Sequence, residues 1–336
     1  MRHPPTRNQR PRSARFRRHL RQRGNPRGSA PLTADLKVGH YTTGPAGYGK
    51  IGSMPIRLIA LDIDGTLLNS RFGVSDGNRA AIAEAARRGI EVALVTGRRY
   101  DFALPVAQQI DSPLTMIVNN GALVRTKEGH THLRHLLPRG TALRVLQATE
   151  TWRPSASVVF DRPRANQIIV ETIDLEDGLR GAYYKFNLPF LAEARPLETC
   201  LDEDPIQVML AGQFQAMQEA ERALRGAPFS GEFSVAVTTY EARNFSMIDI
   251  LNPRISKGVT LAEWAALRGV SREEILAIGD NHNDEEMLSF AGIPVVMENS
   301  VPELKSRGWH VTRSNDEDGV AAAIERFVLR EAPERA

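Results

Sequence analysis

From residue 56 onward, short apolar runs alternate with longer amphipathic segments. Short apolar runs are typical of buried parallel strands, and the amphipathic segments are typical of helices packed on them. Such alternation predicts an α/β fold, a doubly wound parallel sheet of Rossmann-like type with helices on both faces. In chain order we expect strands at 56–61, 91–95 and 114–118, with helices at 76–88 and 99–110 between them.

The pattern changes between residues 127 and 243. Apolar and polar positions alternate more often here, as in a sheet with one covered face, and this predicts an inserted α+β domain. Its expected strands are 157–160, 167–173, 205–211 and 233–239, and its expected helices are 139–152 and 214–225.

The first pattern resumes at residue 244, so that 54–126 and 244–336 together would form one core domain. We expect strands at 245–251, 274–279 and 293–297, and helices at 257–268, 284–290 and 318–329.

Charge is distributed unevenly along the chain. Residues 1–53 hold ten Arg, two Lys and one Asp, a net charge of +11, so the remaining residues carry −8 of the total of +3. This segment is also rich in Pro, Gly and Ser, which predicts disorder. It could be a disordered tail, an Arg-rich targeting peptide, or an upstream extension of a gene that begins at Met54. The third is favoured, because Met54 leads directly into the first strand.

Composition also narrows the possible partners and the compartment. The single cysteine, Cys200, excludes an intrachain disulfide and any CxxC pair, which indicates a cytoplasmic protein. No apolar run approaches the ~20 residues that span a bilayer, so no membrane partner is expected. A nucleic-acid partner is not favoured, because no aromatic or folded module lies beside the basic tail. We expect a monomer or homodimer.

Carboxylates follow two of the predicted strands. Asp62 and Asp64 of DIDGT come directly after the first strand, and Asp280 and Asp284 of GDNHND follow the strand at 274–279. In open α/β sheets, functional groups lie where such strands end. Four crowded carboxylates would repel one another, and a hard cation such as Mg²⁺ would offset that repulsion.

Other polar residues are expected near this edge of the sheet. Thr96 and Asn120 follow the second and third strands. Ser256 can cap the helix that Lys257 opens, which places Lys257 at the positive helix end that favours anions. His282 is interpreted as a loop residue and not a ligand, because Mg²⁺ prefers oxygen.

In order, DIDGT, Thr96-Gly97-Arg98, Lys257 and GDNHND resemble the four signature motifs of the haloacid dehalogenase-like (HAD) superfamily of phosphatases. The segment NNGA, residues 119–122, and the position of the insertion resemble its Cof-type subgroup, which carries a C2-type cap. The resemblance covers roughly residues 56–330. It implies a HAD core domain with 127–243 as an inserted α+β cap that determines substrate specificity.

The resemblance also implies a role for each motif residue. Asp62 would be the nucleophile and Asp64 the general acid and base, while Lys257 would neutralise the nucleophile and the transferred group. Mg²⁺ would be held by Asp62, the backbone carbonyl of Asp64 and Asp280, with Asp284 as a further ligand or a partner of the ligands. The residues implied to contact phosphate or substrate are Thr96, Gly97, Arg98, Asn120 and Asn283.

These roles predict a Mg²⁺-dependent phosphatase that hydrolyses a small phosphorylated metabolite through an aspartyl-phosphate. Carboxylates are competent nucleophiles, and a metal ion with a fixed ammonium group offsets the charge of the incoming phosphate. Resemblance suggests a sugar phosphate, a nucleotide or pyridoxal phosphate as substrate. Dehalogenases of the superfamily lack the second acidic residue, so Asp64 favours phosphate chemistry. A phosphosugar mutase and a non-catalytic phospholigand-binding protein remain as alternatives.

Overall fold

The structure, a computed structural model, describes residues 55–240 and 243–330. The predicted basic extension at 1–53 lies outside the described residues. Within the described ranges, no helix combines the length and the apolar character that crossing a membrane requires.

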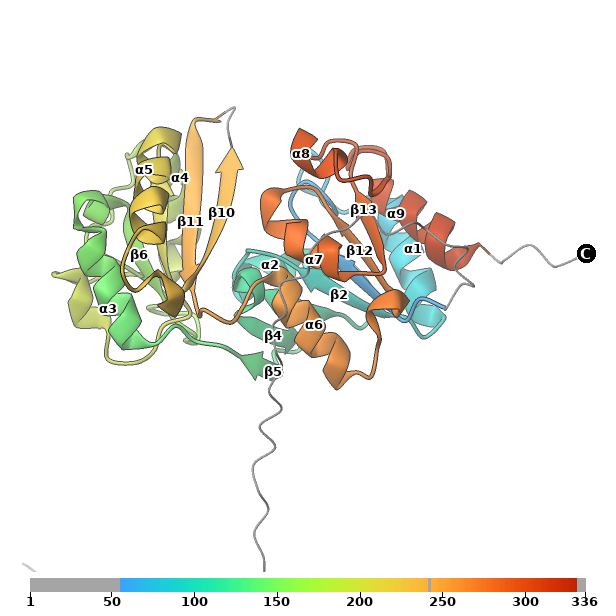
Figure 1. The fold of residues 1–336 in the computed structure, drawn as a ribbon, viewed down its shortest axis with the longest axis horizontal. Coiled ribbons are helices and arrows are strands. Elements are labelled where there is room, and N and C mark those ends of the chain that lie inside the picture. The colour runs from blue at the N-terminus through green and yellow to red at the C-terminus, as the bar shows by residue number, and fades with distance from the viewer. Residues whose placement is uncertain (1–54, 241–242, 331–336) are drawn as a thin grey trace, which may run out of the picture. The chain divides into compact units, whose positions relative to one another are not determined.

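The core domain is built on an eight-stranded sheet (Figure 1). The six strands from β14 to β3 run parallel, and β4 and β5 extend the edge antiparallel. The central strand β1 is completely buried, which explains why its sequence LIAL shows no polar alternation. In spatial order the strands are β14 (His310–Val311), β13 (Ile293–Val296), β12 (Ile275–Gly279), β1 (Leu58–Leu61), β2 (Glu91–Val95), β3 (Thr115–Val118), β4 (Leu123–Thr126) and β5 (Thr131–Arg134).

Helices cover both faces of this sheet. Helices α1 (Asp76–Arg87), α2 (Tyr100–Ala107) and α9 (Gly319–Ile324) pack in one cluster with Ile59 and Leu61. Helices α6 (Lys257–Leu267), α7 (Glu285–Phe290) and α8 (Pro302–Lys305) pack in another with Leu58 and Ala60. Consecutive side chains of one strand point to opposite faces, so this division confirms the predicted doubly wound core.

The cap domain contains a mixed six-stranded sheet. Helices α3 (Arg139–Ala148) and α5 (Phe214–Arg225) contribute to the cluster on one face, and α4 (Gly178–Asn187) contributes to the cluster on the other. The predicted inserted α+β cap is therefore present. In spatial order the strands are β10 (Ser234–Tyr240), β11 (Phe245–Leu251), β9 (Gln207–Gly212), β6 (Ala156–Val159), β7 (Ile168–Val170) and β8 (Leu191–Glu193).

The two expected domain boundaries are wrong in detail. Strand β5 still belongs to the core sheet, beyond the predicted boundary at 126. Strand β11 was expected to open the second half of the core, but it pairs antiparallel with β9 and β10 in the cap. Its sequence FSMIDIL is apolar enough to resemble a core strand, and only its partners distinguish the two positions. Helix α4 was not predicted, because Gly178 and Gly181 lower its helix propensity.

Candidate active site

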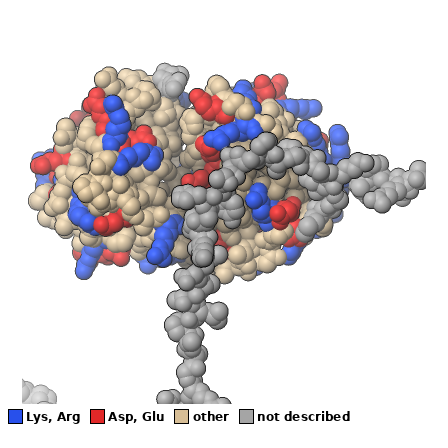
Figure 2. Space-filling view, viewed as in Figure 1, with Lys and Arg blue, Asp and Glu red and all other residues tan. Residues whose placement is uncertain are grey.

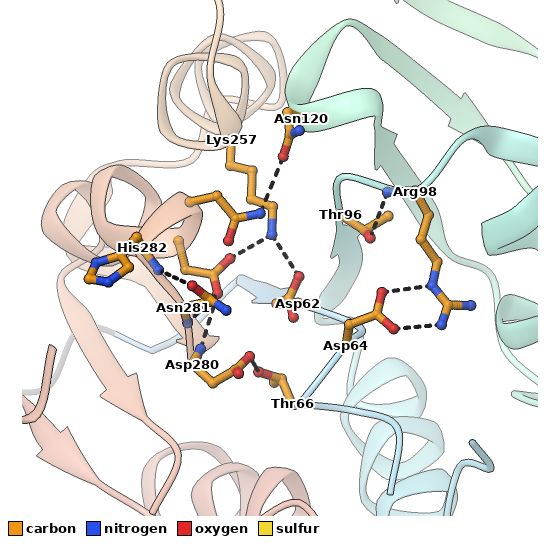
Figure 3. Close-up of polar contacts among 12 residues, drawn as sticks. Asp62, Asp64, Thr66, Thr96, Arg98, Asn120, Lys257, Asp280, Asn281 and His282 are labelled. Carbon is orange, nitrogen blue, oxygen red and sulfur yellow. Dashed lines mark hydrogen bonds and ion pairs between the residues drawn. The ribbon is translucent and has the colours of Figure 1, made fainter. Parts of the chain in front are cut away.

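Three buried carboxylates converge at the carboxyl end of the core sheet. Asp62 follows β1 and Asp280 follows β12, and these strands are parallel neighbours. Asp284 ends the short 3₁₀ turn His282–Asp284. One carboxylate oxygen from each of the three lies within 4.8 Å of the others. Figure 3 shows Asp62 and Asp280 among the residues around this cluster. The expected convergence of Asp62, Asp280 and Asp284 is therefore present.

A single ammonium group bridges two of these carboxylates. Nζ of Lys257 donates hydrogen bonds to Oδ1 of Asp62 and to Oδ1 of Asp284, both at 2.6 Å. The Lys257 side chain is only 1% exposed. Lys257 is the first residue of helix α6. The side chain of the capping residue Ser256 accepts a hydrogen bond from the backbone amide of Val259, as the sequence predicted. The helix start thus fixes the ammonium group between the carboxylates.

The carboxylate cluster carries more negative charge than Lys257 balances. Burial and the charge of Asp284 together raise the pKa of Asp62 to about 7, although Lys257 acts in the opposite direction. Burial, together with Asp62 and Asp284, raises the pKa of Asp280 well above its usual range. Burial lowers the pKa of Lys257, but the two carboxylates reverse that effect and leave it raised. An all-oxygen donor set with excess negative charge fits a hard cation such as Mg²⁺.

Hydrogen bonds fix the acidic loops around the cluster. Oδ1 of Asp280 accepts from the Thr66 hydroxyl at 2.9 Å. Oδ2 of Asp284 accepts from the backbone amides of Asp280 and Asn281 at 3.0 and 3.1 Å. Gly65, at φ +81°, is required here, because a Cβ atom would lie 2.3 Å from Oδ2 of Asp280. The loop that follows β1 and the loop that follows β12 are therefore held together beside the carboxylate cluster.

Asp64 lies outside this cluster and has a different partner. Its two carboxylate oxygens accept from Nε and Nη2 of Arg98, at 2.7 and 2.6 Å (Figure 3). The Asp64 side chain is 43% exposed, whereas that of Asp62 is 6% exposed. The hydroxyl oxygen of the buried Thr96 accepts from the Arg98 backbone amide at 3.1 Å.

Asn120 joins the site from a tight turn, Asn119–Gly121, that follows β3. Its Oδ1 accepts from Nδ2 of Asn283 at 3.4 Å. A Cβ atom on Gly97 would lie 3.1 Å from the same Oδ1, so Gly97 provides room for the Asn120 amide.

His282 is exposed and stays outside the carboxylate cluster. All ten predicted site residues thus lie in connected groups at one edge of the sheet.

Two buried cap residues in contact with this site were not predicted. Nδ2 of Asn120 donates to Oδ2 of Asp249 at 2.9 Å, and Nε2 of Gln207 donates to Oδ1 of Asp249 at 2.6 Å. Asp249 is the single charged residue in the strand FSMIDIL. A lone carboxylate in an apolar strand is the signal that could have identified it, because such a group needs polar partners when buried.

A protein-family model for haloacid dehalogenase-like hydrolases matches residues 59–324. Phosphatase YwpJ of Bacillus subtilis is 29% identical over 293 residues, which cover 81% of this chain and 100% of that protein. The 5-amino-6-(5-phospho-D-ribitylamino)uracil phosphatase YitU of Bacillus subtilis is 27% identical over 282 residues, covering 80% of this chain and 97% of that protein.

Solved structures agree with the family match. A haloacid dehalogenase-like hydrolase from Bacteroides thetaiotaomicron superposes with a TM-score of 0.67 at 26% identity, covering 81% of this chain and 99% of that one. One from Bacillus subtilis superposes with a TM-score of 0.68 at 26% identity, covering 81% and 100%. The predicted family and its hydrolase class are confirmed. The chain belongs to the haloacid dehalogenase-like hydrolase family.

Proposed function

We propose that this protein is a Mg²⁺-dependent phosphatase that hydrolyses small phosphate monoesters through an aspartyl-phosphate on Asp62. The observation that carries the proposal is the pair of 2.6 Å hydrogen bonds from Lys257 to Asp62 and Asp284, beside the third carboxylate of Asp280. Relatives of this chain are named phosphatases, which supports the same chemistry.

Asp62, Asp280 and the backbone carbonyl of Asp64 are the proposed ligands of Mg²⁺. When bound, the ion would supply positive charge that offsets repulsion between the carboxylate and the phosphate. Asp284 is proposed as a further ligand or a partner of the ligands, because one of its oxygens belongs to the cluster while Oδ1 accepts from Lys257 and Oδ2 from two backbone amides. It holds the lysine and the loop in place.

Asp62 and Asp64 divide the chemistry between them. A carboxylate oxygen of Asp62 attacks phosphorus, and the bond from phosphorus to the leaving oxygen breaks while Asp64 gives that oxygen a proton. Asp64 then takes a proton from water, which attacks the aspartyl-phosphate. Inorganic phosphate leaves, and Asp62 is regenerated. The greater exposure of Asp64 suits a group that meets the leaving group and water.

Thr96 and Lys257 would hold the transferred phosphoryl group. The Thr96 oxygen already accepts a hydrogen bond from the Arg98 amide, so its own proton can be donated to a phosphoryl oxygen. Lys257 lies beside the attacking carboxylate, where its charge offsets that of the phosphate. Asn120, Asn283, Gly97 and Arg98 complete the proposed phosphate and substrate side of the site.

The proposed substrates are small phosphorylated metabolites, such as sugar phosphates, nucleotides or pyridoxal phosphate. Some relatives are named as phosphatases of 5-amino-6-(5-phospho-D-ribitylamino)uracil, a phosphorylated small molecule. On the described part of the face in Figure 2, Lys and Arg are interspersed with Asp and Glu. Nucleic-acid partners more often require a continuous basic patch.

A phosphometabolite panel, assayed with and without Mg²⁺, tests this proposal. Hydrolysis of at least one compound should require Mg²⁺ and should fall to the background rate in Asp62→Asn. Asp111→Asn is the matched control, because Asp111 is exposed in a loop away from the cluster, and it should keep wild-type rates. Metal-independent hydrolysis, or normal rates in Asp62→Asn, would show that the proposed chemistry is wrong.

A further inference from the structure

We propose that Asp249, a residue of the cap, is a positioning residue that fixes the amide orientations of Asn120 and Asn283 and so couples the cap to the phosphate-binding groups. This inference rests on the function proposed above, because it assigns a partner to residues of that same site. It is carried by a continuous set of hydrogen bonds between the cap and the core.

Asp249 is a buried carboxylate with neutral partners. It is 6% exposed, and its two oxygens accept from Nδ2 of Asn120 and Nε2 of Gln207. Within the described ranges, no Lys or Arg forms an ion pair with it. Burial raises its pKa to about 7, although the hydrogen bonds from Asn120 and Gln207 act in the opposite direction. A carboxylate buried in this way requires donors directed at both oxygens.

The hydrogen bonds continue outward with one polarity. Oε1 of Gln207 accepts from Nδ2 of Asn119 at 3.2 Å, and Oδ1 of Asn120 accepts from Nδ2 of Asn283 at 3.4 Å. Each of these amides therefore directs its NH₂ group along the chain toward Asp249. Both oxygens of Asp249 accept, whereas an amide can rotate to exchange its donor and acceptor ends. Asp249 is thus the group that selects one orientation for all of them.

The turn that carries Asn120 also contacts the other phosphate-binding groups. The backbone N–H of Asn120 donates to the backbone carbonyl of Thr96 at 3.0 Å, and the backbone N–H of Asn119 donates to the backbone carbonyl of Arg98 at 2.9 Å. Both asparagines have φ +51°, a conformation that Asn tolerates better than most residues.

The other side of this turn packs on the start of α6, the helix that Lys257 opens. A Cβ atom on Gly121 would lie 2.5 Å from the Ser256 carbonyl oxygen, and the Thr260 hydroxyl donates to the Gly121 carbonyl at 2.9 Å. Two side-chain hydrogen bonds to the cap, at Asp249 and at Gln207, therefore hold a turn that contacts Thr96, Arg98 and the helix that begins at Lys257.

Asp249→Asn tests the inference with little change in shape. The variant offers a donor where Asn120 or Gln207 needs an acceptor, so the amides can reorient. With p-nitrophenyl phosphate and saturating Mg²⁺, kcat should fall by about tenfold or more, while KM changes by less than about threefold. Calorimetry with inorganic phosphate on the Mg²⁺-loaded protein should show weaker binding in the variant.

A double-mutant cycle separates positioning from general loosening of the cap. If Asp249 acts through Asn120, then Asp249→Asn should cause no further loss of kcat in an Asn120→Ala background. The matched control is Asn187→Ala, which removes another bond between the domains, the one to Arg99. Its effect should add to that of Asn120→Ala. Additive losses for Asp249→Asn, or an unchanged kcat, would overturn the inference.

Two further measurements distinguish a loss of positioning from a loss of stability and from a failure of the proposed function. Thermal melting should place Asp249→Asn within about 5 °C of the wild type. If it melts lower, Asp249→Ala is used instead, since it removes both acceptor oxygens without introducing an amide, and it should show the same loss. If the wild type hydrolyses nothing, the proposed function fails. The phosphate calorimetry then decides the positioning role alone, and equal affinity in wild type and variant would overturn it.

Discussion

Arg98 donates two hydrogen bonds to Asp64, one to each carboxylate oxygen, at 2.7 and 2.6 Å. The pair is bidentate, so it fixes the plane of the carboxylate as well as its position. In the proposed mechanism Asp64 gives a proton to the leaving group. Each carboxylate oxygen has a second lone pair, so Arg98 can hold the plane of the carboxylate while one oxygen carries that proton.

Asp64→Asn should affect substrates according to how much their leaving groups need a proton. The amide cannot act as an acid, so kcat for an alkyl phosphate should fall by about 10²–10⁴-fold. p-Nitrophenolate leaves without protonation, and formation of the aspartyl-phosphate from that ester should be affected much less. Burst kinetics on the two substrates measures this difference. Equal losses of the first step would argue against Asp64 as the acid.

Arg98→Lys should lower activity although charge is retained. A lysine gives Asp64 a single point contact in place of the planar two-bond contact, so the carboxylate loses its fixed orientation. We expect kcat for an alkyl phosphate to fall by about tenfold. Arg88→Lys is the control, because Arg88 pairs with Glu84 on the exposed face of α1, and its kcat should be unchanged. A wild-type kcat in Arg98→Lys would contradict the orienting role.

Lys257→Met should remove activity and also weaken the fold. The substitution leaves Asp62 and Asp284 buried without their shared counterion. Breaking a buried ion pair by removing one partner costs about 3–5 kcal/mol of unfolding free energy. Urea denaturation near neutral pH measures that loss, and added Mg²⁺ should recover part of it. Lys185→Met, at an exposed pair with Glu176, should change stability by less than about 1 kcal/mol.

The metal-free protein should lose stability as pH rises from about 4 to about 7. Burial raises the pKa values of Asp62 and Asp249 from 3.8 to about 7, so in this window the folded state holds protons that the unfolded chain has released. Mg²⁺ binds the ionised form, so its stabilising effect should be larger near pH 8 than near pH 5. Thermal melting at both pH values measures it. An equal gain in Tm would contradict the proposed Mg²⁺ ligands.

The sequence predicted the core and most of the site because their signals are local. Asp62 and Asp280 each follow an apolar run that ends abruptly, and parallel strands bring such ends to one edge. Asp249 and Gln207 could not be assigned in this way. They belong to strands whose place in the cap depends on long-range pairing, and their partners, Asn119 and Asn120, lie far away in the sequence. Only the folded chain shows that these amides converge on one carboxylate.

The most direct test of phosphoryl transfer to Asp62 is acid quenching of the Mg²⁺-loaded enzyme during turnover of a substrate, followed by peptide mapping for covalent phosphate. The peptide that contains Asp62 should carry phosphate in the wild type, and Asp62→Asn should carry none. Phosphate on a different residue, or an unlabelled wild-type enzyme that shows a burst of alcohol release, would contradict the proposed nucleophile.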